Sequence, residues 1–361
     1  DFLDPGAKVT RKTVFRSQLL AGFLREHPDA TTTDRLLALI RSGSLHGRIG
    51  ALEALETTTE HARVSPTLIA LASGEHLRDL SKPDQETVRR AAFCTLAMRE
   101  GQAAKAFIAK ALRSQDPSLC AGALSAMAEA PPESTAGDVL AFLQGLEGKE
   151  SVEAALAGAV ADYYEVHADL LSDVDHARAL GAVAVVPNLP SEPRTRMFDV
   201  LRVTDAKVGT KIKRAAETFA DASRPDLRMA ARLFLARLKD RGAKRDLLEP
   251  FDDEIKRNKK SIAAHSDRAK IYHEIGEYGA AERDWRFVME QMAEDDLTRS
   301  RKEPFIGIAR ALARLKKYRE AASYLSQGPI SVDELKELGH ERDFQAMRKT
   351  RYGDIFQFGD D

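Results

Sequence analysis

The sequence has few of the residues and none of the motifs that mark enzymes, metal sites or membrane spans. Its 361 residues include two cysteines, Cys94 and Cys120, too few for a disulfide framework or a four-thiolate zinc site. Both lie in apolar stretches typical of helices, so buried, reduced thiols are expected. No run of about 18 apolar residues occurs, which predicts no transmembrane helix. The net charge of −1 provides no global field to attract nucleic acid or a membrane surface.

Catalytic and nucleotide-binding motifs are missing as well. Gly148-Lys149 lacks the upstream glycine of a phosphate-binding loop. Gly43, Gly47 and Gly50 precede no expected strand, which argues against a dinucleotide fingerprint. Neither Gly-x-Ser-x-Gly nor His-Glu-x-x-His is present. We therefore expect a protein that is not an enzyme, with no catalytic residues and no cofactor.

One acidic stretch is the best metal candidate in the chain. It contains two histidines and three aspartates, which are His167, Asp169, Asp173, Asp175 and His176. Such side chains can bind a divalent ion, but their spacing here matches no known ligand pattern. A solvated acidic loop with two surface histidines is the favoured interpretation, and no metal is expected.

What the sequence does contain is a recurring helical theme, which predicts an all-α fold. From about Lys12 to Asp240, loops carrying Pro or a capping residue precede apolar helices rich in Ala and Leu. The residues expected just before these helices are Ser65-Pro66, Pro83-Asp84, Asp116-Pro117, Ser191 with Pro193, and Ser223 with Pro225. Similar helix cores begin at Val88, Leu119, Val152 and Leu227. The first three are 31 and 33 residues apart, a period typical of helix pairs.

Two of these segments, Asp84 to Leu96 and Pro225 to Leu235, resemble the second helix of a HEAT repeat. In that family the helix carries an Asp or Pro entry, then Val-Arg, then alanines. The resemblance implies a HEAT-like α-solenoid, an α/α superhelix, over residues 1–242, with repeats from about 12 to 240. An array of this kind buries its core between neighbouring repeats.

Past Arg241-Gly242 the pattern changes to another repeat type. A linking helix is expected around Leu247 to Lys260. The stretch from Ile262 to Ala293 then places small, aromatic and turn residues at fixed spacing, namely Ala269, Tyr272, Gly276, Tyr278, Ala281 and Trp285. Small side chains let two helices cross closely, and Gly276 permits a left-handed turn between them. This spacing resembles a tetratricopeptide (TPR) repeat.

A second copy follows, with Lys316 at the place of the turn glycine. Its matching positions are Phe305, Ala309, Leu312, Tyr318, Ala321 and Leu325. The resemblance implies a TPR-like domain over 243–361, with repeats at about 261–328. Ser331 to Glu334 reads as a capping box that opens a C-terminal capping helix. The apolar residues Phe344, Ile355, Phe356 and Phe358 are expected to fold the tail back over the last repeat.

The TPR resemblance also implies a partner-binding groove. In that family the first helix of each repeat lines the concave face and binds extended peptides. The cationic positions that correspond here are Lys270, His273, Arg310 and Arg314. They could hold an acidic peptide or a C-terminal carboxylate through charge-assisted hydrogen bonds. The asparagines of the chaperone-binding carboxylate clamp are missing, and the competing interpretation is ordinary surface cations.

Charge is distributed unevenly along the chain. Residues 115–193 hold two basic and thirteen acidic side chains, whereas residues 207–260 hold sixteen basic and nine acidic ones. The basic residues include Lys207, Lys211, Lys213, Arg214, Lys256, Arg257, Lys259 and Lys260, a candidate patch for nucleic acid or an acidic partner. The segment's three phenylalanines sit at helix-core spacing, which argues against base stacking. Solvated helix faces with ion pairs among neighbours are the competing interpretation.

Together these patterns favour a non-catalytic scaffold or adaptor that binds a peptide or partner protein on a concave helical-repeat surface. The alternative is a nucleic-acid-associated HEAT-like protein, of the DNA glycosylase kind, using the basic 207–260 segment. A helical-repeat chaperone or a lyase subunit that acts on a cofactor-bearing partner also stays open. Because the chain begins at Asp1 rather than Met, an N-terminal segment is expected to have been removed. A soluble, cytoplasmic protein is the expectation; the oligomeric state is left open.

Overall fold

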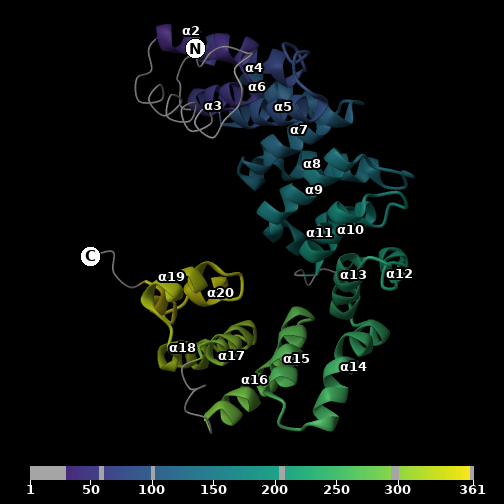
Figure 1. The fold of residues 1–361 in the computed structure, drawn as a ribbon, viewed down its shortest axis with the longest axis vertical. Coiled ribbons are helices and arrows are strands. Elements are labelled where there is room, and N and C mark those ends of the chain that lie inside the picture. The colour runs from purple at the N-terminus through teal and green to yellow at the C-terminus, as the bar shows by residue number, and fades with distance from the viewer. Residues whose placement is uncertain (1–29, 57–60, 99–101, 203–207, 294–300, 358–361) are drawn as a thin grey trace. The chain divides into compact units, whose positions relative to one another are not determined.

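The chain folds entirely into helices wherever its structure is described. The computed structural model describes residues 30–56, 61–98, 102–202, 208–293 and 301–357, and every regular element in these ranges is a helix (Figure 1). The expected all-α class is confirmed. The chain divides into two compact units, Asp1–Ile212 (unit 1) and Lys213–Asp361 (unit 2). The predicted change from HEAT-like to TPR-like repeats near residue 242 stays a prediction.

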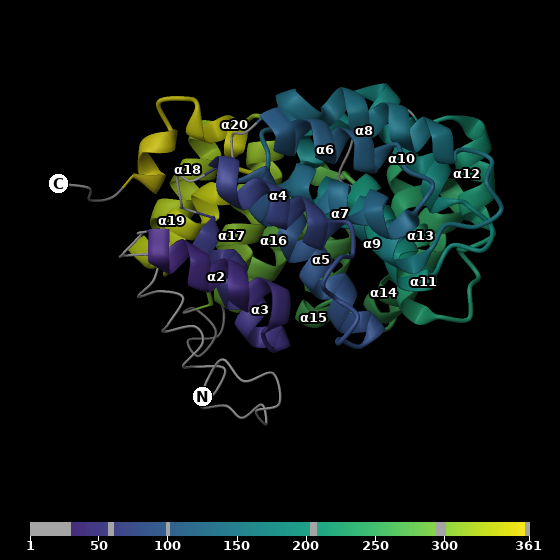
Figure 2. The same cartoon turned by 90° about the horizontal axis from the view of Figure 1, so that it is seen from above.

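Unit 1 is built from helices in two layers. Its elements are α2 (Ala30–Ser42), α3 (Leu45–Leu55), α4 (His61–Ala72), α5 (Lys82–Ala97), α6 (Gln102–Leu112), α7 (Pro117–Ala128), α8 (Pro132–Leu146), α9 (Ala154–Val166), η1 (Ala168–Ser172), α10 (Val174–Ala184) and α11 (Ser191–Leu201), with α12 (Thr210–Glu217) at the boundary. Helices α3, α5, α7, α9 and α11 form one layer, in which α3 packs on α5, α5 on α7, α7 on α9 and α9 on α11. Helices α4, α6, α8 and α10 lie along the other side (Figure 2). Sequence neighbours such as α4 and α5 pack across the layers, as helix pairs do.

Some of the helices in unit 1 begin where the sequence predicts, and others do not. Asp116 caps α7 by accepting a hydrogen bond from the Ser118 amide, with Pro117 in the first turn, as expected. The helix start predicted after Ser65-Pro66 is wrong, because α4 already begins at His61 and includes Pro66. The entry at Ser191 is also shifted, since Ser191 is itself the first residue of α11. Of the two thiols, Cys120 is buried and Cys94 is half-buried, and neither forms a disulfide.

Unit 2 contains three successive helical hairpins followed by a C-terminal segment. Its elements are α13 (Pro225–Arg237), α14 (Arg241–Arg257), α15 (Ile262–Glu274), α16 (Tyr278–Ala293), α17 (Glu303–Arg314), α18 (Tyr318–Gln327), α19 (Val332–His340), α20 (Gln345–Arg348) and η2 (Gly353–Phe356). Helices α13 and α14, α15 and α16, and α17 and α18 form the hairpins, and α14 packs on α15 as α16 packs on α17.

The three hairpins turn in the same way. Two residues after the end of the first helix, each hairpin has a residue in the left-handed conformation: Lys239 (φ 65°), Gly276 (φ 76°) and Lys316 (φ 61°). After α15, the Glu277 amide donates to the Tyr272 carbonyl and the Gly276 amide to the His273 carbonyl, the paired bonds of a Schellman motif. The same pairs of bonds follow α13 and α17. The predicted left-handed turn at Gly276 is confirmed, and the lysines adopt it without a glycine.

The core of unit 2 runs through the predicted crossing and into the C-terminal segment. Ala269 and Ala281 are fully buried where α15 and α16 meet. Ser331 and Glu334 form the predicted capping box of α19. The tail folds back as expected, since the side chains of Phe344, Phe356 and other residues from the C-terminal segment join one apolar cluster with those of α16 to α18. Phe358 lies outside the described residues.

Candidate partner-binding surfaces

The four cations predicted to line a groove lie on α15 and α17, and each already contacts an acidic side chain of its own chain. Lys270 Nζ lies 3.1 Å from Asp267 Oδ1, one turn away on the same helix. His273 Nε2 lies 2.9 Å from Asp343 Oδ2. Lys270 is therefore an exposed surface cation, whereas His273 contacts the C-terminal segment.

Two arginines on α17 contact the same segment, between α19 and α20. Arg310 binds Glu341 through two parallel hydrogen bonds, with Nε 2.7 Å from Oε2 and Nη2 2.6 Å from Oε1. Arg314 donates from Nε to the Tyr278 hydroxyl at 2.9 Å and lies 3.7 Å from Asp343 Oδ1. His273, Arg310 and Arg314 are thus brought together, as the sequence predicted, around two carboxylates from the same chain.

These contacts set the ionisation of Asp343. Burial by itself raises the pKa of this carboxyl, but the His273 hydrogen bond and the positive charges of His273, Arg314 and Arg310 outweigh it, so the pKa lies below its ordinary value. An acidic peptide would have to replace both Glu341 and Asp343 to reach these cations. The partner-binding role of the four residues stays a prediction, with much of their hydrogen-bonding capacity already used.

Ion pairs with neighbours also account for much of the predicted basic patch. Lys211, in unit 1, lies 3.9 Å from Glu147. In unit 2, Lys213 pairs with Asp240 at 3.0 Å, Lys256 with Asp253 at 2.8 Å and Arg257 with Glu254 at 3.2 Å. Arg214, Lys259 and Lys260 are exposed. Lys207 lies outside the described residues. Local pairing of this kind fits the interpretation of the segment as solvated helix faces.

The acidic stretch considered for a metal does not form a ligand cluster. His176 is buried, with Nδ1 2.7 Å from the Tyr164 hydroxyl, and burial lowers its pKa. Asp173 caps α10 by accepting a hydrogen bond from the Asp175 amide. The His167 ring packs edge-on against Tyr163. Across the described residues, no three His, Cys, Asp or Glu side chains are placed to hold a metal ion.

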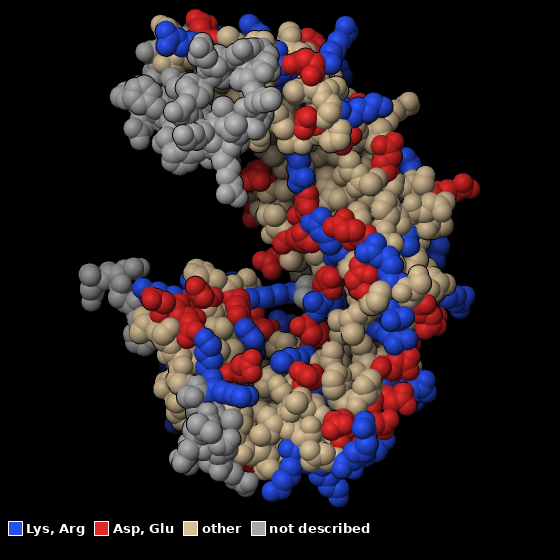
Figure 3. All heavy atoms as spheres, viewed as in Figure 1, with Lys and Arg blue, Asp and Glu red and all other residues tan. Residues whose placement is uncertain are grey.

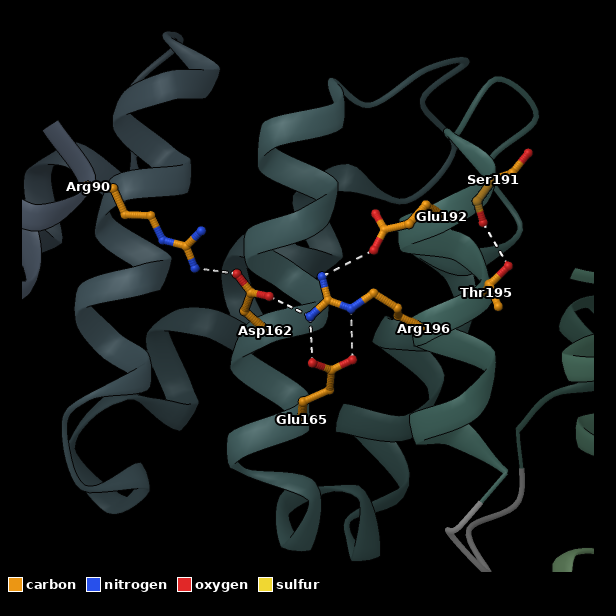
Figure 4. A network of polar contacts seen from close by, with 7 residues as sticks. All are labelled: Arg90, Asp162, Glu165, Ser191, Glu192, Thr195 and Arg196. Carbon is orange, nitrogen blue, oxygen red and sulfur yellow. Dashed lines mark hydrogen bonds and ion pairs between the residues drawn. The ribbon is translucent and has the colours of Figure 1, made fainter. Parts of the chain in front are cut away.

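The odd-numbered layer of unit 1 carries a charged network that the sequence did not predict. Arg196 on α11 is its centre, with Nη2 2.5 Å from both Asp162 Oδ1 and Glu165 Oε2, and Nε 2.8 Å from Glu165 Oε1 (Figure 4). Glu192, one turn earlier on α11, lies 3.5 Å from Arg196 Nη1. Arg90 on α5 pairs with the other oxygen of Asp162. Arg196 and Arg90 thus link α5, α9 and α11 through one shared aspartate.

A hollow lies beside this network, over α7. Helix α7 packs between α5 and α9. Its side chains here are small, so they leave a depression between the two flanking helices. The hollow has a volume of about 240 Å³. We call it the α7 trough; it is lined by Pro83, Glu86, Thr87, Arg89 and Arg90 of α5, Ser118, Ala121, Gly122 and Ser125 of α7, and Ala155 and Ala159 of α9.

Close packing holds the floor of the α7 trough in place. A Cβ atom on Gly122 would lie 2.2 Å from Phe93 Cδ2, so only glycine allows α7 to approach α5 this closely. On the rim, Arg89 donates to the Ala72 carbonyl and pairs with Asp116, which holds its side chain away from solvent. The trough therefore combines an apolar floor of small residues with a rim of charged ones.

Sequence reasoning missed this surface although it noted two of its segments. The helix core that begins at Val88 includes Arg90, and the one that begins at Leu119 includes Gly122. Because Asp162 lies 72 residues after Arg90, only the stacking of α5, α7 and α9 reveals their pairing.

Comparison with family models, curated proteins and solved structures gives no match to this chain. Within the described residues, no helix combines the length and apolar character needed to cross a membrane. The helical fold, the α7 trough and the charge distribution are therefore the observations from which function is inferred.

Proposed function

We propose that this protein is a non-catalytic interaction scaffold whose repeats are HEAT-like up to about residue 240 and TPR-like from about 261. Both kinds of repeat form an α/α superhelix, which offers extended surfaces to peptides and partner helices. The two-layer packing in unit 1 and the repeated hairpin turns in unit 2 support this assignment.

The α7 trough is the observation that carries the proposal. Its volume of about 240 Å³ is below the roughly 300–1,000 Å³ of sites that hold small molecules, and it suits one or two side chains of a protein partner. An apolar floor with a charged rim is the usual composition of a protein-binding surface. We assign the trough to a peptide segment that inserts an apolar side chain between α5 and α9.

A trough-filling variant tests this assignment. Ala155 is an exposed lining residue, so Ala155→Phe fills the space without disturbing the core. Ala106→Phe makes the same change at an exposed position of α6, in the other layer, and is the matched control. Random peptides displayed on phage are selected against the full chain, and their affinities for the three proteins are compared.

We expect selected peptides to bind the wild type and the Ala106→Phe variant and to lose at least tenfold in affinity for Ala155→Phe. Selection of peptides that bind all three proteins equally would exclude the trough as the binding surface. Failure to select any peptide would count against the scaffold proposal itself.

A further inference from the structure

We infer that the segment bound in the α7 trough is basic, with lysine or arginine on both sides of its apolar residue. This inference rests on the function proposed above and adds the chemistry of the partner. The supporting observation is the balance of charge around the trough, which leaves carboxylates in excess.

Cations at the rim are already used by the chain itself. Arg90 pairs with Asp162. Arg196 contacts Asp162, Glu165 and Glu192. The network thus holds three carboxylates against two guanidinium groups, and both arginines are engaged. An acidic partner would meet carboxylates in excess and would have to displace existing ion pairs.

Three carboxylates at the trough and in the network are exposed. Glu86 is an exposed lining residue of the trough, and within the described residues it forms no ion pair. The side chains of Glu165 and Glu192 are 41% and 64% exposed, so they can accept further hydrogen bonds. In the region of α9 and α11, acidic and basic side chains intermix on the surface (Figure 3). Glu86 lines the trough from α5, whereas Glu165 and Glu192 belong to the network that Asp162 joins to the lining residue Arg90.

Two further carboxylates lie near α5. Glu129, which follows α7, and Glu56, which follows α3, both act on the Cys94 thiol of α5, so their charges lie near that helix. Residues 115–193, which supply α7 to α10, contain only two basic side chains. The charged residues of the trough and its network are five carboxylates and three guanidinium groups, and this balance favours a cationic segment over an anionic one; they are Glu86, Asp116, Asp162, Glu165 and Glu192, with Arg89, Arg90 and Arg196.

Three synthetic peptides test the inference. They share a central leucine and a length of about fifteen residues, and their flanks carry lysine, glutamine or glutamate. Binding to the full chain is measured by fluorescence anisotropy at low salt and in 0.5 M NaCl. The variant Glu86→Lys reverses one rim charge, and Glu75→Lys reverses an exposed charge in the turn between α4 and α5, outside the trough.

We expect the lysine peptide to bind most tightly, to weaken in high salt, and to lose roughly three- to tenfold in affinity for Glu86→Lys, as the reversal of one exposed charge implies. Glu75→Lys should bind it like the wild type. Equal or tighter binding of the glutamine or glutamate peptide, lost in Ala155→Phe, would overturn the basic partner and leave the scaffold proposal standing. If all three peptides bound and Ala155→Phe did not weaken them, both the basic partner and the scaffold proposal would be overturned. Both would also be overturned if none of the peptides bound.

Discussion

The left-handed turn between α15 and α16 makes opposite predictions for two glycines three residues apart. Gly276 sits at φ 76°, where a residue with a Cβ atom costs roughly 1–2 kcal/mol. A Cβ atom there would also lie 1.8 Å from Arg237 Nη1, so the guanidinium would have to move and lose its 3.1 Å hydrogen bond to the Tyr278 hydroxyl. That bond contributes about 0.5–1.5 kcal/mol. Gly276→Ala should therefore lower the free energy of unfolding by about 1.5–3.5 kcal/mol.

Gly279 lies inside the first turn of α16 and provides the control. A Cβ atom there would meet only Arg283 Nη1, at 3.9 Å, which is an ordinary contact distance. Alanine is favoured over glycine in a helix by up to about 1 kcal/mol, so Gly279→Ala should be neutral or stabilising. Both variants reduce the freedom of the unfolded chain equally, so the difference between them reports the turn.

Lys316 completes the series, because it occupies the matching position in the next hairpin with φ 61°. Its side chain is exposed. Lys316→Gly removes the left-handed cost of roughly 1–2 kcal/mol and adds about 0.5–1 kcal/mol of backbone entropy, which leaves a gain of about 0.5–1 kcal/mol.

Urea unfolding followed by tryptophan fluorescence is the assay. Trp285 is the only tryptophan, it is buried in α16, and its signal therefore reports on unit 2. From most to least stable, the expected order is Lys316→Gly, wild type and Gly276→Ala, with Gly279→Ala at or above the wild type. If Gly276→Ala were as stable as Gly279→Ala, the left-handed turn would not be a constraint and the argument would be refuted.

Two further predictions follow from titrating groups. Because the pKa of Asp343 lies below its ordinary value of 3.8, its ionised form stabilises unit 2 above that pH, and the contribution is lost as the pH falls through the lowered value. The urea midpoint should therefore fall more steeply below about pH 4 in the wild type than in Asp343→Asn, and parallel curves would contradict this. Burial, with Glu129 and Glu56, raises the pKa of the Cys94 thiol to about 11 despite the opposing charge of Arg90. At pH 8 only about one thiol in a thousand is then ionised, so alkylation of Cys94 in the native protein should be slow, and rapid modification before unfolding would contradict this.

The hairpins of unit 2 show how far local sequence can predict this fold. In α15 and α16 the small residues, the aromatic residues and the turn glycine all appear at fixed spacing, and the structure places them as predicted. The hairpin of α13 and α14 has the same turn, but Lys239 occupies it and Arg232 stands at the position of Ala269. A close helix crossing is recognised in a sequence by small residues, and long side chains at these positions do not indicate one. The hairpin was therefore missed, although the left-handed turn and its hydrogen bonds are the same.

Contacts between distant segments were beyond prediction for a different reason. His273 and Asp343 are 70 residues apart, and Arg90 and Asp162 are 72 apart. Each pair forms because helices between its members stack, and no local pattern encodes which exposed charges will meet. The positions of the cations on α15 and α17 could be read from the repeat spacing, but the carboxylates that bind them could not.

The two charged stretches differ in how far their own side chains can pair, and this difference supports the proposed basic partner. Several basic residues of 213–260 pair with acidic side chains of the same stretch, as Lys256 does with Asp253 and Lys213 with Asp240. Residues 115–193 cannot neutralise themselves, because two basic side chains face thirteen acidic ones. Arginines from outside this stretch bind some of these carboxylates. Within the described residues, the following form no ion pair: Glu129, Glu133, Glu150, Glu153, Asp169 and Asp173. The carboxylates left without an ion pair in this stretch support the proposal that the α7 trough receives a basic segment.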